Sequence, residues 1–155
     1  MATKVISGFP AIGKTYASKH STLMCVDCDS SQWNWIIKPD GSRIPNPDFP
    51  QNYIDHIKFQ IKHDFLDFVF VSSHENVRQC LKDNFIDFTM VVPALNCKKE
   101  YYKRMEHRGS PMTLIQLVME NWNDWLIERQ LESNCIVLNQ GQTLIDILPS
   151  LCKTS

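Results

Sequence analysis

Residues Gly8 to Thr15, near the start of the chain, follow the pattern G-x-x-x-x-G-K-T. A short apolar run, Val5-Ile6, precedes them, and a helix-compatible stretch follows as far as His20. The pattern therefore predicts a strand, a phosphate-binding loop and a helix, in that order. This restricts the fold, because such a loop needs a strand leading into it and a helix leading out of it.

Phosphate binding explains which residue types occur in this loop. Gly8 and Gly13 allow a tight turn that aims successive backbone N–H groups at phosphate oxygens. Lys14 would add a positive charge that reaches the outer phosphates, and the Thr15 hydroxyl would ligate Mg²⁺. We therefore expect a nucleoside triphosphate to bind the loop and the start of its helix, at Gly8, Phe9, Pro10, Ala11, Ile12, Gly13, Lys14, Thr15 and Tyr16.

Along the rest of the chain, apolar β-branched runs alternate with helix-length segments. We expect strands at 4–7, 22–26, 67–72, 88–92 and 134–138, and helices at 13–20, 51–64, 75–84, 97–108, 111–132 and 143–152. This alternation is typical of an α/β domain with a mostly parallel sheet covered on both faces. A chain of 155 residues suits a single domain, 1–155.

Charge and composition argue against several classes of protein. The net charge is −1, so the chain lacks the basic surface that a nucleic-acid partner needs. It has no apolar stretch long enough to cross a bilayer, which argues against a membrane partner. The six cysteines are scattered, and Cys25-x-x-Cys28 has no second pair to complete a zinc site. We expect a cytoplasmic protein with reduced thiols.

Two carboxylates follow the second expected strand. Asp27 and Asp29 are two residues apart, so in extended backbone they share a face at the carboxyl end of that strand. Ligands of α/β folds bind at such ends. One carboxylate could hold Mg²⁺ and the other could accept a proton from an attacking hydroxyl. The alternative is an Asx-rich turn in which Asp29 or Ser30 caps the next segment.

The third expected strand ends in Ser72-Ser73-His74 and not in an acidic residue. An Mg²⁺-associated Asp is absent there, which leaves the metal to Thr15 and Asp27. His74 could contact a substrate or could be a surface histidine. Arg78, one helical turn further on, could project toward the same cleft or lie on a solvated face.

Arg104 and Arg108 are four residues apart, so both lie on one face of the expected helix. Gly109 and Pro111 then end that helix and begin the next. Two guanidinium groups before a flexible joint suit a lid, around 100–112, that closes over a transferring phosphoryl group. The alternative is two exposed arginines paired with Glu100 or Glu106 of the same helix.

An insertion at 30–60 follows the second strand and runs into the helix that starts near Gln51. Its proline-rich part, 30–50, also contains Asp40-Gly41, and we expect it to be irregular.

The whole chain resembles the small P-loop kinases, the superfamily of nucleoside monophosphate kinases and shikimate-kinase-like enzymes. It is most similar to compact nucleotide-kinase-like proteins of bacteriophages and prophages, which implies a bacterial or phage-infected cell. The resemblance is carried by Gly8–Thr15, Asp27-x-Asp29 and Arg104-x-x-x-Arg108-Gly109. It implies a three-layer P-loop NTPase fold with a five-stranded parallel sheet in the order 2-3-1-4-5.

The resemblance also implies roles for individual residues. Lys14 and Thr15 would hold ATP and Mg²⁺, Asp27 would assist the metal, and Asp29 would face the phosphoryl acceptor. Arg104 and Arg108 would match the lid arginines of these kinases. The insertion would form the acceptor-binding region, with candidate contacts at Trp33, Trp35, Arg43, Asn52 and Tyr53. The chain lacks the Asp-Gly-Phe-Pro-Arg segment of adenylate kinases, so the acceptor need not be AMP.

These features together predict an ATP- and Mg²⁺-dependent phosphotransferase. The leading acceptor is a nucleoside or deoxynucleoside monophosphate, whose phosphate would be bound by Lys38, Arg43 and Arg78. One alternative is a hydroxyl acceptor, a small metabolite or a nucleoside, which the pair Asp27 and Asp29 would suit. Another is a protein that binds or sequesters a nucleotide without turnover.

Overall fold

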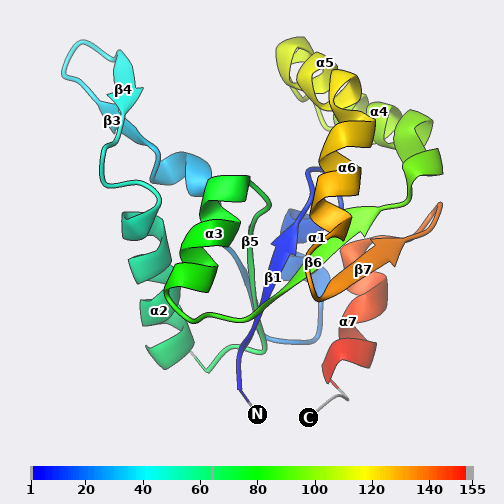
Figure 1. The fold of residues 1–155 in the computed structure, drawn as a ribbon, viewed down its shortest axis with the longest axis horizontal. Helices are drawn as coiled ribbons and strands as arrows, with labels where there is room; N and C mark the ends of the chain where they lie inside the picture. The colour runs from blue at the N-terminus through cyan, green and yellow to red at the C-terminus, as the bar shows by residue number, and fades with distance from the viewer. Residues whose placement is uncertain (1, 64, 153–155) are drawn as a thin grey trace.

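A five-stranded parallel sheet forms the centre of the domain (Figure 1). The computed structural model describes residues 2–63 and 65–152. The strands of this sheet are β1 (Lys4–Gly8), β2 (Cys25–Asp27), β5 (Phe68–Ser72), β6 (Phe88–Pro93) and β7 (Cys135–Leu138). Every pairing between them is parallel. The strands are runs of apolar residues, as sheets covered on both faces require.

The insertion contains a hairpin where we expected irregular chain. Strands β3 (Trp35–Ile37) and β4 (Arg43–Pro45) pair antiparallel outside the main sheet. Gly41, at φ +86°, allows the turn, and the Lys38 N–H donates to the Ser42 carbonyl at 2.8 Å. The main sheet runs β2-β5-β1-β6-β7. The labels differ from the expected 2-3-1-4-5 because the hairpin strands take the numbers 3 and 4, but each strand of the parallel sheet has the expected neighbours.

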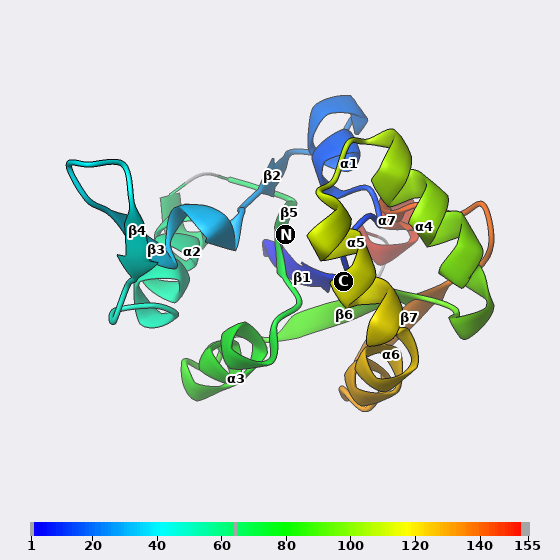
Figure 2. The same cartoon turned by 90° about the horizontal axis from the view of Figure 1, so that it is seen from above.

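Helices cover both faces of the sheet (Figure 2). They are α1 (Lys14–His20), α2 (Gln51–His63), α3 (Glu75–Asp83), α4 (Lys98–His107), α5 (Met112–Glu120), α6 (Trp122–Gln130) and α7 (Leu144–Cys152). The alternation of side chains along β5 decides which helix meets which face. Val69 and Val71 pack with α2 and α3, whereas Phe68 and Phe70 pack in the cluster that contains α1 and α7 residues.

The segment expected to be one helix at 111–132 is two helices, α5 and α6. They meet at Asn121, whose side-chain amide donates to the Leu117 carbonyl at 2.8 Å. Asparagine side chains compete in this way with the regular backbone hydrogen bonds of a helix. None of the helices in the described ranges is long and apolar enough to cross a membrane.

Trp122 is the largest fully buried side chain of the core, with 1% of its surface exposed. Its ring meets Phe9 edge-on at a centroid distance of 5.6 Å and lies 5.6 Å from the ring of Tyr101. Its indole N–H donates to the Leu95 carbonyl at 2.9 Å. Trp122 thus joins α6 to α4 and to the loop after β1.

Truncation of this tryptophan should destabilise the domain strongly. We expect Trp122→Ala to lower the free energy of unfolding by about 3–5 kcal/mol, because it leaves a cavity and an unpaired Leu95 carbonyl. Leu131→Ala is the control, since Leu131 is 80% exposed and its loss should change stability by no more than about 0.5 kcal/mol. Urea denaturation measures both, and equal midpoints for the two variants would contradict this account of the core.

Candidate active site

A cavity of about 660 Å³ opens at the carboxyl ends of β1, β2 and β5. We call it the central cavity. Its lining comes from the loop after β1, the start of α1, the residues that follow β2 and β5, the end of α4 and one residue of α5. The first three of these contribute Lys14, Thr15, Asp27 and His74, and α4 and its C-cap contribute Arg104 and Arg108. The structure therefore brings together residues that lie up to a hundred positions apart.

Two glycines of the loop from Gly8 to Thr15 have local reasons. A Cβ on Gly8 would lie 2.5 Å from Ile12 Cδ1 and 3.0 Å from Lys14 Cδ, so the side chain of Ile12 would have to shift and that of Lys14 would be crowded. Gly13 precedes α1 at φ +100°, which L-residues rarely adopt. Phe9 and Ile12 are fully buried and do not line the cavity, so only their backbone could contact a ligand there.

Several polar groups of this loop are available to a ligand. Within 2–63 and 65–152, the backbone N–H groups of Gly13, Lys14 and Thr15 donate to no protein acceptor. The Lys14 ammonium donates to the Gly8 carbonyl at 2.7 Å, which holds it against the loop. This arrangement presents backbone donors and one positive charge at one wall of the cavity.

The position of Lys14 lowers its pKa to about 8. Burial is the largest cause, since it disfavours the charged form. The carboxylate of Asp27 acts in the opposite direction, and the nearby guanidinium of Arg108 lowers the pKa further. A bound anion would favour the charged form of Lys14 and raise its pKa.

The two carboxylates after β2 differ in their partners. Asp27 Oδ2 accepts from the Thr15 hydroxyl at 2.8 Å. Asp29 Oδ1 accepts from the Ser31 N–H at 2.9 Å and thereby caps a short 3-10 helix, Ser30–Gln32. Asp29 is therefore a cap, as one interpretation of the sequence had it, and it also lines the central cavity.

The two arginines expected in the lid both line the central cavity but differ in their contacts. Arg104 donates to the carbonyls of Ala11 and Gln142 at 3.1 and 2.9 Å, pairs with Glu100 at 2.7 Å, and lies over the ring of Tyr101. Arg108 donates to Ser110 Oγ at 2.7 Å and is exposed. Among the described residues, no carboxylate pairs with Arg108.

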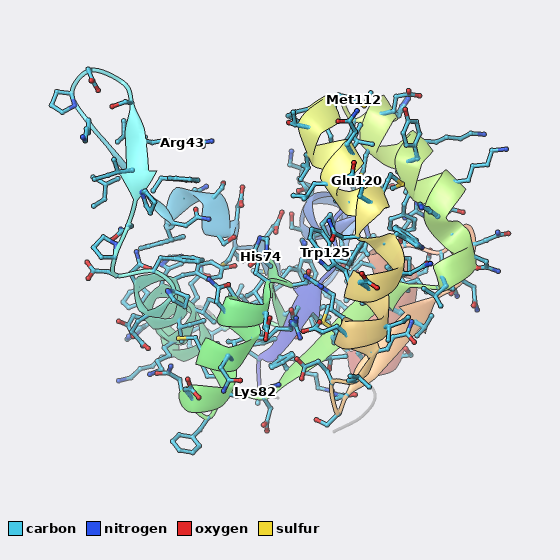
Figure 3. All side chains as sticks on the ribbon, turned by 45° about the horizontal axis from the view of Figure 1, so that its top comes forward. Arg43, His74, Lys82, Met112, Glu120 and Trp125 are labelled. Atoms are coloured by element: carbon cyan, nitrogen blue, oxygen red, sulfur yellow. The ribbon has the colours of Figure 1, made fainter. Side chains whose placement is uncertain are left out.

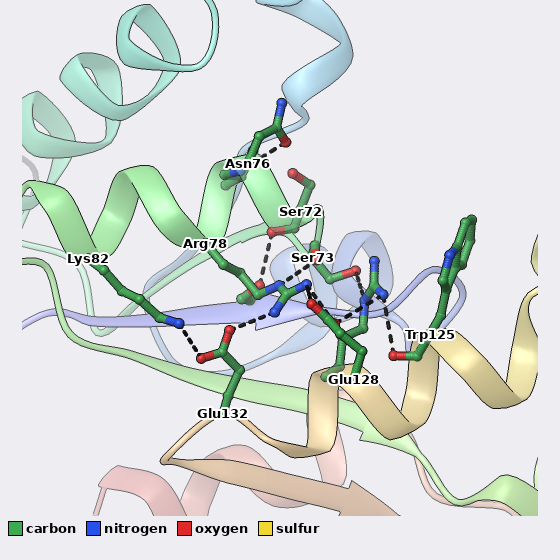
Figure 4. Close-up of polar contacts among 11 residues, drawn as sticks. Ser72, Ser73, Asn76, Arg78, Lys82, Trp125, Glu128 and Glu132 are labelled. Carbon is green, nitrogen blue, oxygen red and sulfur yellow. Dashed lines mark hydrogen bonds and ion pairs between the residues drawn. The ribbon is translucent and has the colours of Figure 1, made fainter.

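Arg78 does not line the central cavity, contrary to its expected role as a substrate contact (Figure 4). Its side chain is buried between α3 and α6, where it pairs with Glu132 at 2.6 Å and with Glu128 at 2.7 Å. Its Nε also donates to the Ser73 carbonyl at 2.8 Å. Neither the cleft nor a solvated face was the correct expectation, because the acidic partners lie fifty or more residues away, Glu128 on α6 and Glu132 just after it.

Arg129 was missed by the sequence analysis. Its Nε donates to Ser73 Oγ at 3.2 Å, and its guanidinium lies 5.7 Å from the ring centre of Phe9. Burial lowers its pKa to about 10. The signal in the sequence was its position seven residues after Trp122 and three after Leu126, an arginine on the apolar face of a helix.

All five residues of the insertion that were expected to contact the acceptor lie outside the cavity lining: Trp33, Trp35, Arg43, Asn52 and Tyr53. Trp33 stacks on His56 at 4.8 Å, and Arg43 lies over the ring of Trp35 at 4.4 Å. Tyr53 is fully buried, and its hydroxyl donates to the Cys28 carbonyl. Figure 3 shows Arg43 on β4, apart from His74 at the end of β5.

His74 does line the central cavity. Although the residue as a whole is exposed, desolvation of its imidazole lowers the pKa, and the nearby charges of Arg129, Lys14 and Arg78 lower the pKa further. These causes disfavour the charged form of the ring. Among the described residues, no three His, Cys, Asp or Glu side chains gather as a metal site.

Comparisons with known proteins support the fold and nothing finer. No family model matches the chain, and no curated protein matches it. A crystal structure of an uncharacterized protein from Eubacterium ventriosum ATCC 27560 is similar over 99% of both chains, with a TM-score of 0.56 and 15% sequence identity. At this identity the similarity shows a shared fold.

The lowered pKa of Lys14 predicts a pH dependence of stability. The folded pKa of about 8 lies below the ordinary lysine pKa of 10.5, so folding disfavours the charged form. That cost is fully present below pH 8 and disappears as the pH rises to 10.5, so stability should rise across this window. The rise should be absent in Lys14→Met and should remain in Lys19→Met, whose lysine is exposed on the same helix. Urea denaturation at several pH values measures it, and equal slopes for all three proteins would contradict the lowered pKa.

Proposed function

We propose that this protein is an ATP- and Mg²⁺-dependent phosphotransferase. The observation that carries the proposal is the convergence of Lys14, Asp27 and Arg108 on one cavity beside the loop Gly8–Thr15. Phosphoryl transfer depends on positioning and on fixed positive charge, and these residues supply both.

The loop fits the phosphates of a nucleoside triphosphate. The unpaired N–H groups of Gly13, Lys14 and Thr15 would donate to phosphate oxygens, and the Lys14 ammonium would bind the outer phosphates. The absent side chain at Gly8 leaves the space that the lysine occupies. Phosphate binding would also raise the pKa of Lys14 and keep it charged.

Thr15 and Asp27 fit a magnesium ion shared with the phosphates. Their side-chain oxygens lie 2.8 Å apart, and Mg²⁺ commonly binds one or two protein oxygens together with phosphate and water. When bound, the ion would neutralise charge on the phosphates during transfer. The chain needs no cluster of three acidic ligands for this arrangement.

The two arginines would have different roles. Arg104 is held by two backbone carbonyls and by Glu100, so it would fix α4 against the loop after β1. Arg108 has only Ser110 as a partner among the described residues, so its guanidinium is free to bind the transferring phosphoryl group. A free arginine would raise the rate by stabilising the negative charge on the transferring phosphoryl group.

The proposal predicts MgATP binding and slow ADP release that both depend on Lys14. In Lys14→Ala, ADP release should fall by about a hundredfold or more, because the loop amides cannot replace the lost charge. Lys19→Ala is the matched control on the exposed side of α1 and should behave as the native protein. Calorimetry and a coupled ADP assay measure both quantities. MgATP binding without ADP release under any condition would indicate a nucleotide-binding protein without turnover.

The different roles of the arginines predict different kinetic effects. Arg108→Ala should lower kcat by about 10²–10³-fold with little change in the Kd for MgATP, because Arg108 acts on the transferring group. Arg104→Ala should weaken MgATP binding and lower the unfolding midpoint, because it frees α4 from the loop. Lys103→Ala, exposed on the same helix, is the control. Identical effects of Arg104→Ala and Arg108→Ala would refute the separation.

A further inference from the structure

The charges of the central cavity are divided between its walls. The cations Lys14, Arg104 and Arg108 come from the start of α1 and from α4 with its C-cap. The residues after β2 and β5 form another wall, which we call the acceptor wall and which consists of Asp27, Cys28, Asp29, Ser30, Ser72, Ser73 and His74. This wall carries two carboxylates and three hydroxyl groups, and desolvation and neighbouring cations lower the pKa of its imidazole.

The cations expected to bind an acceptor phosphate lie elsewhere. Arg78 is committed to Glu128 and Glu132 between α3 and α6. Arg43 lies over Trp35 on the hairpin, and Lys38 is exposed on the same hairpin. None of the three lines the central cavity.

One further arginine lies behind the acceptor wall. Arg129 donates to Ser73 Oγ, but it is 6% exposed and is enclosed by the rings of Phe9 and Trp125. It is absent from the cavity lining. A phosphate group would have to displace Ser73 to reach it.

A monophosphate is therefore a poor partner for the acceptor wall. It carries about two negative charges near neutral pH and would meet the carboxylates of Asp27 and Asp29. Like charges brought together in a partly desolvated cavity repel, and no cation on this wall compensates.

The acceptor wall has groups that suit a neutral hydroxyl compound. Asp29 uses Oδ1 for the Ser31 N–H, and within the described residues its Oδ2 has no hydrogen-bond donor. A free carboxylate oxygen of this kind can accept the proton of a hydroxyl.

We infer that the phosphoryl acceptor is a neutral compound whose hydroxyl binds at Asp29, an inference that rests on the proposed phosphotransferase function. The hydroxyl oxygen attacks the γ-phosphorus of ATP, and a new O–P bond forms. The bond between that phosphorus and the β,γ-bridging oxygen breaks, and ADP leaves with the electron pair. The hydroxyl proton passes to Asp29 and then to solvent.

The test compares matched acceptors that differ by one phosphate group. ADP release is measured at saturating MgATP with ribo- and deoxynucleosides, with their 5′-monophosphates, and with small sugars and polyols. Each is measured with the native protein, with Asp29→Asn, and with Asp48→Asn, an exposed aspartate of the insertion outside the cavity. Asp29→Asn keeps the cap, because an amide oxygen also accepts from the Ser31 N–H. Calorimetry of MgATP with each protein separates donor binding from transfer.

The inference expects stimulation by at least one neutral hydroxyl compound and none by the monophosphates. Asp29→Asn should lower the stimulated rate by about a hundredfold with an unchanged Kd for MgATP, and Asp48→Asn should not. Stimulation by a monophosphate would overturn the inference and leave the phosphotransferase proposal intact.

If no compound of either kind stimulates ADP release, the inference is tested on the slow hydrolysis of ATP. In that reaction, water takes the place of the acceptor hydroxyl. A loss of about tenfold or more in Asp29→Asn supports the inference, and an unchanged rate overturns it. A protein that binds MgATP but transfers to neither water nor any acceptor would refute the proposed function, and the inference would fall with it.

Discussion

The loop Gly8–Thr15 depends on the burial of one of its own residues, Phe9. The Phe9 N–H donates to the Val91 carbonyl at 3.0 Å, which ties the start of the loop to β6. Its ring is fully buried and meets Trp122 edge-on, with the guanidinium of Arg129 at 5.7 Å. The buried side chain of Phe9 holds the loop against the core. The backbone N–H groups of Gly13, Lys14 and Thr15 can therefore remain unpaired and face the cavity. Rigid elements of this kind reduce the cost of ordering a binding site.

The same anchor links the loop to the acceptor wall. Arg129 reaches from α6 past Phe9 to Ser73, and Arg78 reaches from α3 to Glu128 on α6 and to Glu132 just after it. Figure 4 shows the contacts of Arg78, and Ser73 lines the central cavity. A buried ion pair adds little net stability, but the loss of one partner leaves an uncompensated charge. Their effect is therefore to fix the relative position of α3 and α6, and with it the wall that carries Ser73 and His74.

The sequence predicted the features that depend on local patterns. The loop, five strands of the parallel sheet and the cavity residues Lys14, Asp27, Asp29, Arg104 and Arg108 all follow from spacing and periodicity. The hairpin was missed because Pro39 and Pro45 indicate irregular chain, whereas the turn at Gly41 still allows β3 and β4 to pair. The partners of Arg78 could not be predicted, since Glu128 and Glu132 lie fifty or more positions away. Long-range side-chain pairs of this kind leave no periodic signal in one sequence.

The central claim is that the loop binds the phosphates of ATP beside Lys14, Thr15 and Asp27. A crystal structure with Mg²⁺ and a non-hydrolysable ATP analogue tests it most directly. The account predicts phosphate oxygens at the N–H groups of Gly13, Lys14 and Thr15, the metal at Thr15, and the Lys14 ammonium on a phosphate instead of the Gly8 carbonyl. An empty loop at saturating analogue, or an analogue bound elsewhere on the molecule, would contradict it.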